Sequence, residues 1–383
     1  MAVRKRRWTN DKGEHHEAWV VDYSANGKRH TKTFEKKRDA DQFHANVTVD
    51  VGKGIHTPES RSLTVGQAGK QWLDYIEREG VERSTFDHYV THVNRHIVPR
   101  IGNAKLATLT TPMVNDFRDQ LVADLSRALA RKVLVSFRSI IKDARRRGTI
   151  AHNVVEGVKI ANDKRSKRKL QVGRDIPTPD EVRRILTAAP DGCWRALLAI
   201  AAFAGLRASE LRGLRWRDVD PNAGMIHVRQ RADAWGTIGR PKTETSERVI
   251  PIGPFVINTL RQWKLANPKS DLVFSGKNGG PVSHSVMMNS GYWPAQRGAG
   301  LVVNPDAEKP KPKYSGIHAL RHFFASWCIN RRRDGGLELP LKTVSERLGH
   351  STIVLTADTY GHLFPMGDES EELAAAERVL LSS

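Results

Sequence analysis

The sequence has few cysteines, a deficit of acidic residues and no long apolar run. Its two cysteines, Cys193 and Cys328, lack the paired spacing of a zinc site and do not support a disulfide framework. No apolar run reaches the roughly 18 residues of a membrane-spanning helix, and the mean hydropathy is −0.50. A Gly-x-x-x-x-Gly-Lys phosphate loop is also missing. We therefore expect neither a metal nor a nucleotide cofactor, and a reducing cytoplasm is the expected compartment.

Positive charge is in large excess. The chain of 383 residues carries 62 Lys and Arg against 42 Asp and Glu, a formal net charge of +20. This excess favours a polyanionic partner, and nucleic acid is the first expectation. An anionic membrane surface is the alternative, which the lack of an apolar run disfavours. The basic residues 4–7 are followed by polar residues rather than by an apolar stretch, so no export signal is expected.

The first 56 residues predict a small sheet with one helix. Two runs of strand-forming residues, 18–23 and 29–34, flank the turn sequence Asn26-Gly27, which is a strong hairpin signal. Apolar residues at helical spacing over 36–52 then predict a helix that covers the sheet. The domain is short for independent stability, which suits a role in binding DNA. The alternative is a plain N-terminal cap.

A helical domain is predicted over 62–160, after a linker rich in Gly, Pro and Ser. Thr64 and Gln67 form a capping box at its first helix. Its longest helix, 126–147, alternates an apolar face with basic residues. DNA contact is expected from this helix, although a solvated face explains part of any such run. With one lysine of the N-terminal sheet, the candidate DNA-binding residues are Lys32, Arg131, Lys132, Arg138 and Lys142.

A basic, flexible linker over 161–175 precedes a third domain, 176–383. Thr178, Pro179 and Glu181 mark a helix start, and strands are expected over 225–229 and 247–252 among helices, an α+β pattern. The tail 369–381 reads as an amphipathic helix that docks on a neighbouring copy, with packing on its own domain as the alternative. The predicted fold class is multidomain and mainly α, with small β-sheets.

Three segments of this third domain carry residues suited to one phosphodiester. Arg207 follows an apolar run and is expected at the end of a buried helix, with Glu210 one turn further to orient a cation. His318 and Arg321 share one helix face, and His350 precedes Tyr360 by ten positions. A phenol can bond covalently to phosphorus, and fixed cations stabilise the charge on its oxygens. Each segment alone is a weak signal, so their joint occurrence is what indicates a phosphoryl-transfer site.

The order and wording of these segments resemble the tyrosine recombinase family, and the phage-type integrases in particular. The resemblance covers most of the chain: Ala-Gly-Leu-Arg-Ala-Ser-Glu-Leu, His-Ala-Leu-Arg-His, and Leu-Gly-His-Ser through Asp-Thr-Tyr-Gly-His. It implies that Arg207 and Arg321 hold the scissile phosphate and that Tyr360 attacks phosphorus to give a 3′-phosphotyrosyl link. His318 and His350 would bond the phosphate, with His318 a possible proton acceptor. Lys242, before a hairpin strand, would protonate the departing 5′ oxygen.

The resemblance also assigns a function to each domain. It implies that 1–56 binds arm-type DNA sites, 62–160 binds core-type sites and 176–383 cleaves and rejoins the strands. A homotetramer on DNA would pass through a Holliday junction and integrate, or excise, a phage or mobile-element genome. The expected partners are double-stranded attachment sites, a host DNA-bending protein and an excisionase, at the nucleoid of a bacterial host. Two alternatives remain open: a DNA-binding regulator without chemistry, and a type IB topoisomerase-like enzyme that reseals one strand.

Overall fold

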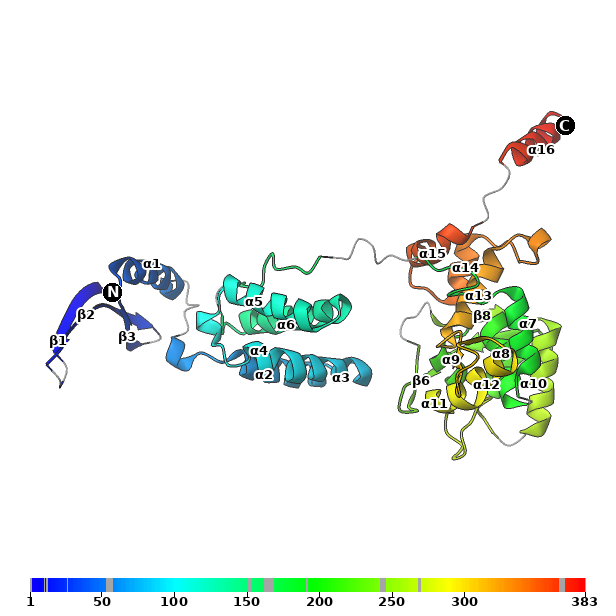
Figure 1. Ribbon diagram of the computed structural model, residues 1–383, viewed down its shortest axis with the longest axis horizontal. Helices are drawn as coiled ribbons and strands as arrows, with labels where there is room; N and C mark the ends of the chain where they lie inside the picture. Colours follow the sequence, from blue (N-terminus) through cyan, green and yellow to red (C-terminus); the bar gives the residue numbers. More distant parts are fainter. Residues whose placement is uncertain are drawn as a thin grey trace. The chain divides into compact units, whose positions relative to one another are not determined.

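The computed structural model forms two compact units, Met1–Lys167 and Arg168–Ser383 (Figure 1). Within the ranges it describes, no helix is long and apolar enough to cross a bilayer. Helices predominate in both units, and the sheets are small. The described residues are 2–9, 11, 13–25, 27–52, 58–150, 153–161, 169–190, 192–241, 246–267, 270–364 and 369–382.

The first unit begins with an antiparallel sheet covered by one helix. Val21 and Tyr23 of the sheet meet Ala40 and Val47 of the helix in a small apolar core. The predicted hairpin and helix are confirmed, although Asn26 itself lies outside the described residues. The first strand was not predicted, because its basic residues show no apolar alternation. In chain order the elements are β1 (Ala2–Thr9), β2 (His15–Ala25), β3 (Lys28–Phe34) and α1 (Lys37–Gly52).

A bundle of helices makes up the rest of this unit. Thr64 and Gln67 form the predicted capping box at the first of them. Val133, Phe137 and Ile140 of the longest helix are fully buried, so its apolar face lies at the centre of the bundle. A π-helical turn, His92–Ile97, lies between α3 and α4. The bundle contains α2 (Val65–Arg78), α3 (Arg83–Thr91), α4 (Val98–Ile101), α5 (Thr111–Asp124) and α6 (Arg127–Arg146).

The second unit combines many helices with short strand pairs. The predicted helix start at Thr178 is confirmed as a capping box with Glu181. The helices are α7 (Pro179–Ala188), α8 (Cys193–Phe203), α9 (Ala208–Gly213), α10 (Pro254–Ala266), α11 (His284–Val286), α12 (Trp293–Gly298), α13 (His318–Ile329), α14 (Leu341–Leu348), α15 (Ile353–Tyr360) and α16 (Glu369–Leu381).

Its strands form three small antiparallel groups. The predicted strands over 225–229 and 247–252 are confirmed as β5 and β8, which pair with each other. Strand β4 adds to β5, while β6 pairs with β7 and β9 with β10. Their bounds are β4 (Val219–Asp220), β5 (Met225–Val228), β6 (Arg231–Ala232), β7 (Ile238–Gly239), β8 (Arg248–Pro251), β9 (Val302–Val303) and β10 (Lys311–Pro312).

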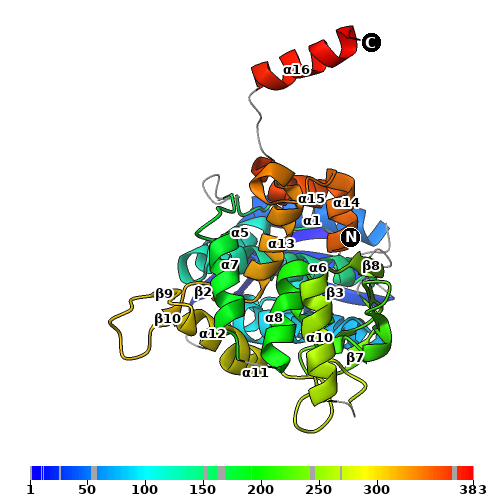
Figure 2. The ribbon, with the colours of Figure 1, turned by 90° about the vertical axis from the view of Figure 1, so that its right-hand side faces the viewer.

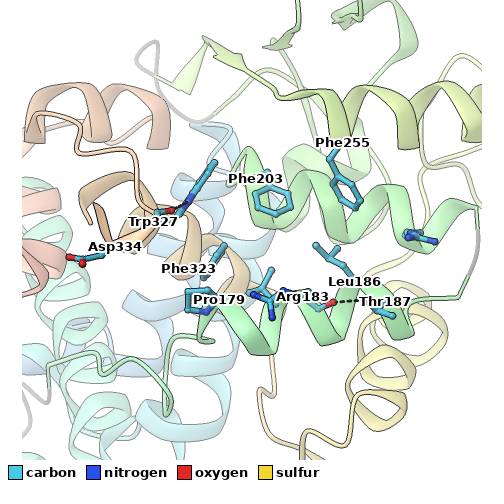
Figure 3. A pocket seen from close by; sticks show the side chains of 12 residues that line it. Pro179, Arg183, Leu186, Thr187, Phe203, Phe255, Phe323, Trp327 and Asp334 are labelled. Atoms are coloured by element: carbon cyan, nitrogen blue, oxygen red, sulfur yellow. Dashed lines mark hydrogen bonds between the residues drawn. The ribbon is translucent and has the colours of Figure 1, made fainter. Parts of the chain in front are cut away.

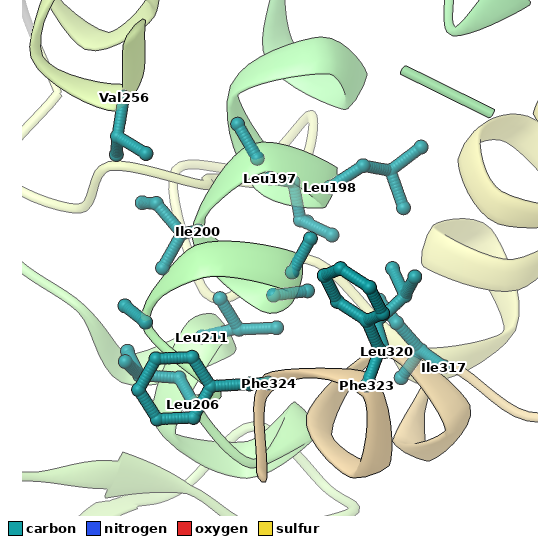
Figure 4. Close-up of a cluster of buried hydrophobic side chains, with 14 of the residues drawn as sticks. Leu197, Leu198, Ile200, Leu206, Leu211, Val256, Ile317, Leu320, Phe323 and Phe324 are labelled. Atoms are coloured by element: carbon teal, nitrogen blue, oxygen red, sulfur yellow. The ribbon is translucent and has the colours of Figure 1, made fainter. Parts of the chain in front are cut away.

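The core of the second unit is centred on α8. This helix packs against α10 and α13 (Figure 2). Its residues from Ala196 to Ala202 are buried. Leu198 and Ile200 lie among Leu211, Leu320 and Phe324 in this cluster (Figure 4). Burial of so much apolar surface holds α8, α9 and α13 rigidly together. The segments that carry Arg207 and Arg321 are therefore parts of one packed body.

Residues 169–175 differ from the expectation of a flexible linker. Leu170 packs against the apolar core of the second unit, and its carbonyl contacts Nε2 of His362 at 2.7 Å. The backbone N–H groups of Asp175 and Ile176 donate to the carbonyl of Gln171. The prediction relied on the basic composition of the whole segment, which does not reveal that a single apolar residue such as Leu170 can anchor its end to the core.

Candidate active site

Arg207 lies at the start of α9 rather than at the end of α8, where the sequence placed it. Helix α8 ends at Phe203, and a turn containing Gly205 at a φ of 63° leads into the new helix. The backbone N–H of Arg207 donates to Oε2 of Glu210, and its Nη1 donates to Oε1, both at 2.8 Å. Nη2 donates to the carbonyl of Gly349 at 2.9 Å. One guanidinium thus joins two segments that are far apart in the chain.

Glu210 holds two arginines, as expected of an orienting carboxylate, but the second partner was not predicted. Arg248 of β8 donates from Nη2 to Oε2 at 2.8 Å and from Nη1 to Oε1 at 3.1 Å. The carboxylate is 3% exposed. Burial alone would raise its pKa, but Arg248 and then Arg207 hold the pKa at about 2. Arg248 is the first residue of β8 and lies 38 positions after Glu210, so local spacing could not predict this contact.

Arg321 is a buried cation close to Arg207. It is 2% exposed and lies in the first turn of α13, where Nη1 donates to the carbonyl of Gly205 at 2.7 Å and Nη2 donates to that of Leu348. Burial, followed by the charge of Arg207, lowers the pKa of Arg321 to about 9. The guanidinium is therefore fixed by backbone carbonyls and lies close to a second cation, which an anion would neutralise.

The predicted segment around His350 contacts both arginines: the carbonyls of Leu348 and Gly349 accept hydrogen bonds from Arg321 and Arg207. Helix α14 ends at Leu348 and is capped by Gly349, whose φ of 61° is left-handed; a Cβ there would lie 2.9 Å from Nη1 of Arg248. Nδ1 of His350 lies 2.8 Å from Oγ1 of Thr356. Burial, and then the nearby arginines, lower the pKa of His350 to about 4. The ring is therefore neutral at physiological pH and can donate one hydrogen bond.

His318 precedes Arg321 by one turn, as the spacing predicted. Its side chain remains exposed overall. Desolvation by the surrounding protein, followed by His322 and Arg321, nevertheless lowers its pKa to about 4. Its ring packs edge-on against that of His322, with centroids 4.7 Å apart.

Tyr360 is the last residue of α15 and is buried, with 1% of its surface exposed. Its ring is parallel to that of His350, with centroids 6.4 Å apart. Its hydroxyl lies 2.7 Å from Nδ1 of His322, a residue that sequence reasoning did not select. Burial raises the pKa of the phenol to about 12, although Arg321 and Arg207 oppose the rise. Both His318 and His322 lie close to Arg321 in the sequence, and spacing alone did not show which of them contacts Tyr360.

A pocket of about 400 Å³ opens beside these residues. Tyr360 is not among the described side chains that line it. Lys242 lies outside the described residues, but Pro241 directly before it borders the pocket. The cationic and polar lining suits an oxyanion, and it comprises Arg207, Ser209, Glu210, Arg231, Ser246, His350 and Ser351.

A second hollow in this unit is apolar (Figure 3). Its lining includes the aromatic residues Phe203, Phe255, Phe323 and Trp327, and the rings of Phe203 and Trp327 meet edge-on with centroids 5.5 Å apart. It is lined by none of the arginines and histidines named above. Within the described residues, no three His, Cys, Asp or Glu side chains are grouped to hold a metal ion.

The candidate DNA-binding residues are in different environments. Lys132 and Lys142 of α6 are exposed, whereas Arg131 is half-buried. Arg138 donates to the backbone carbonyl of Val158 and so fixes the end of the bundle. Lys32 donates to Glu59 at 2.9 Å and lies over the ring of Phe43. The side chains of Arg138 and Lys32 thus have internal partners that spacing could not reveal.

Residues 177–366 match the phage integrase family. The XerC-like tyrosine recombinase of Caldanaerobacter subterraneus subsp. tengcongensis is 24% identical to the chain, over 95% of the chain and 96% of that protein. The tyrosine recombinase XerC of Xylella fastidiosa is 32% identical, over 57% of the chain and 64% of its own length.

Solved structures show the same fold. An integrase of the transposon Tn1549, in complex with a circular intermediate DNA, superposes with a TM-score of 0.61 at 20% identity, over 83% of this chain and all of that one. A lambda integrase tetramer bound to a Holliday junction gives a TM-score of 0.55 at 18% identity, over 90% and 95% of the two chains. With its phenol, arginines and histidines in one packed unit, the chain belongs to the phage integrase family of tyrosine recombinases, enzymes that recombine DNA at specific sites.

Proposed function

We propose that this recombinase cleaves each DNA strand by attack of Tyr360 on a phosphate held by Arg207 and Arg321. The observation that carries the proposal is that Arg207 and His350 line one pocket, while Arg321 is buried close to Arg207 and the ring of Tyr360 is parallel to that of His350. Such fixed donors stabilise the charge that develops on the non-bridging oxygens. The Oη–P bond forms, the bond from phosphorus to the 5′ oxygen breaks, and a 3′-phosphotyrosyl link remains.

Proton transfer completes the step. The 5′ oxygen leaves as a hydroxyl after taking a proton from Lys242, an assignment that the position of Pro241 at the pocket supports. The phenol passes its proton to the imidazole of His318 as its oxygen attacks phosphorus, and His318 and His350 donate hydrogen bonds to the phosphate. Because the energy of the phosphodiester is kept in the tyrosyl link, a 5′ hydroxyl from a partner duplex can reverse the reaction without a cofactor.

The sheet of residues 1–56 is proposed to bind arm-type sites through the face opposite α1. Alternation along the strands puts Val21 and Tyr23 towards the helix, so their neighbours point away. This outer face carries Arg4, Arg6, Arg29, Thr31 and Thr33, all of them exposed. Basic and hydroxyl side chains in such a row suit phosphate and base contacts. Lys32 lies on the other face and is no longer part of the proposed surface.

The bundle of residues 62–160 is proposed to bind core-type sites through α6. Lys132, Val135, Ser139, Lys142 and Arg146 recur at helical spacing on the side that the core leaves open. The two lysines are the exposed side chains of the predicted set on α6. Arg131 is half-buried, and Arg138 donates to the carbonyl of Val158.

Four copies would act together, exchanging strands through a Holliday junction to integrate or excise a phage or other mobile element. The solved lambda integrase tetramer on such a junction has the same fold. In the tail, Leu373, Val379 and Leu380 are more than half exposed, which supports docking of α16 on a neighbouring copy. A host DNA-bending protein and an excisionase are the proposed accessory partners, at the nucleoid of the bacterial host.

A covalent-adduct assay tests the chemistry. The protein is incubated with a nicked core site, denatured in detergent and examined for protein bound to DNA. Wild type should form the adduct, and Tyr360→Phe should not. An adduct that persists in Tyr360→Phe would remove Tyr360 as the nucleophile. No adduct in wild type on its true site would favour a regulator, and resealing without exchange between two duplexes would favour a topoisomerase.

A further inference from the structure

The hydroxyl of Tyr360 has a defined partner in the DNA-free chain. It lies 2.7 Å from Nδ1 of His322, and the two rings are 5.7 Å apart at 60°. Both residues lie outside the set of described side chains that line the phosphate pocket, whereas Leu355 from the first turn of the same helix does line it. The phenol is therefore buried and hydrogen-bonded inside the protein, and it does not line the pocket in which a phosphate would lie.

The direction of this hydrogen bond follows from the two environments. Desolvation, and then the charge of Arg321, lower the pKa of His322 to about 4, while Asp175 opposes the change. The pKa of Tyr360 is raised to about 12 by burial. The phenol therefore keeps its proton and donates a hydrogen bond, which Nδ1 of the neutral imidazole accepts. This arrangement favours the protonated phenol, which is the weakly nucleophilic form.

The surroundings of His322 limit what else this ring can do. Its charged neighbours are Arg321 on its own helix and Asp175 from the segment that enters the unit, and its edge meets His318. Arg321 disfavours a positive charge on the ring. Taking a proton from the phenol is therefore strongly uphill while no phosphate neutralises Arg321.

We propose that His322 is a positioning residue that stores the hydroxyl of Tyr360 away from the phosphate pocket in the DNA-free protein, so that this hydrogen bond must break before attack. The proposal rests on the proposed role of Tyr360 as nucleophile. Arg321 and Arg207 are close enough to influence the phenol, so a rearrangement at the end of α15 can bring the oxygen to them. His322 acts by holding the phenol and not by removing its proton.

Nitration of tyrosine in the DNA-free, full-length protein tests the storage directly. Tetranitromethane is the probe, and mass spectrometry of the digested protein follows each tyrosine. In His322→Ala the rate at Tyr360 should rise about fivefold, as expected from losing one hydrogen bond worth about 1 kcal/mol. In His322→Asn the rate should stay near wild type, because Oδ1 of asparagine can replace Nδ1 as acceptor. Tyr292, fully buried in the same unit, reports on unfolding.

The outcomes separate the alternatives. An unchanged rate at Tyr360 in His322→Ala, or an equal rise in the Ala and Asn variants, would overturn the proposal. If Tyr292 also becomes reactive in His322→Ala, that variant has unfolded and His322→Asn is used instead. A wild-type nitration rate at Tyr360 in His322→Asn then supports the proposal. A raised rate at Tyr360 in His322→Asn, with Tyr292 unreactive, refutes it. On a nicked core site, His322→Asn should form adduct at the wild-type rate, whereas a loss would identify His322 as a proton acceptor instead. Failure of Tyr360→Phe to abolish adduct would refute the proposed function alone, since nitration needs no DNA.

Discussion

Replacing the buried carboxylate of Glu210 by an amide tests the electrostatic design of the site. Glu210 is 3% exposed and accepts from Arg207 and from Arg248, both at 2.8 Å. Glu210→Gln keeps the shape of the side chain but removes the negative charge between the two guanidinium groups. Both cations then lose the partner that offsets their own desolvation.

The size of the effect follows from the pKa of this carboxyl. A fall from the ordinary value of 4.5 to about 2 corresponds to roughly 3 kcal/mol of folding free energy at neutral pH. For a unit of this size, the loss should lower the melting temperature by roughly 6 to 12 °C. Since the pKa is depressed in the folded state, the contribution is complete above pH 4.5 and is lost as the pH falls towards about 2. The difference in melting temperature between Glu210→Gln and wild type should therefore become smaller as the pH falls towards about 2.

Calorimetry of the full-length protein near neutral pH measures this difference. Glu346→Gln is the matched control, because Glu346 is 64% exposed and only approaches Lys342 at 4.0 Å. That substitution should cost less than about 1 kcal/mol. If Glu210→Gln had the same melting temperature as Glu346→Gln, the buried ion pairs would not stabilise the unit as the geometry indicates. Adduct formation should fall as well, because Arg207 would lose its orienting partner.

Three further predictions concern other parts of the chain. Gly205→Ala should cost more than about 2 kcal/mol of stability, because φ is 63° and the new Cβ would lie 2.3 Å from Phe324; thermal melting checks this, and Gly239→Ala, with open space around it, is the control. The pKa values of His318, His322 and His350 are lowered from 6.5 to about 4. The unfolded chain binds protons first, so the melting temperature should drop as the pH falls from 6.5 towards about 4. Replacing Lys132 and Lys142 by alanine should reduce the salt slope of core-site binding by roughly 0.9 each, whereas Lys342→Ala should not change it.

Each of these has a clear contrary result. A Gly205→Ala protein that melts with the control would mean that Phe324 has room to move. A melting temperature independent of pH across the imidazole range would show that the three rings protonate freely when folded. An unchanged salt slope in the double lysine variant would exclude α6 from the DNA interface.

Local patterns were sufficient for much of the fold. The capping boxes at Thr64 and Thr178 and the strand pair that carries Arg248 depend on residues close together in the chain, so spacing predicts them. Strand β1 was missed because half of its residues are basic and it shows no apolar alternation. Only pairing with β2 makes that segment a strand.

The candidate active site was also predictable in part, namely in its residues but not in the contacts between them. Motif wording identified the arginines, histidines and tyrosine that gather in the second unit, since each motif spans only a few residues. It could not show that Arg207 begins a helix, that Glu210 also holds Arg248, or that Arg138 is used internally. These contacts join residues from separate elements, and which of several basic side chains reaches a partner depends on packing.

The sequence by itself determined the family, the residue types proposed for the phosphate site and the excess of positive charge, because these follow from composition and from residue types at short spacing. Only the tertiary structure decided where the phenol lies. Tyr360 and His322 are 38 positions apart, and their 2.7 Å contact exists because α13 and α15 belong to one packed unit. Hydrogen bonds act over a few ångströms, so a contact between distant segments is fixed by the fold that brings them together.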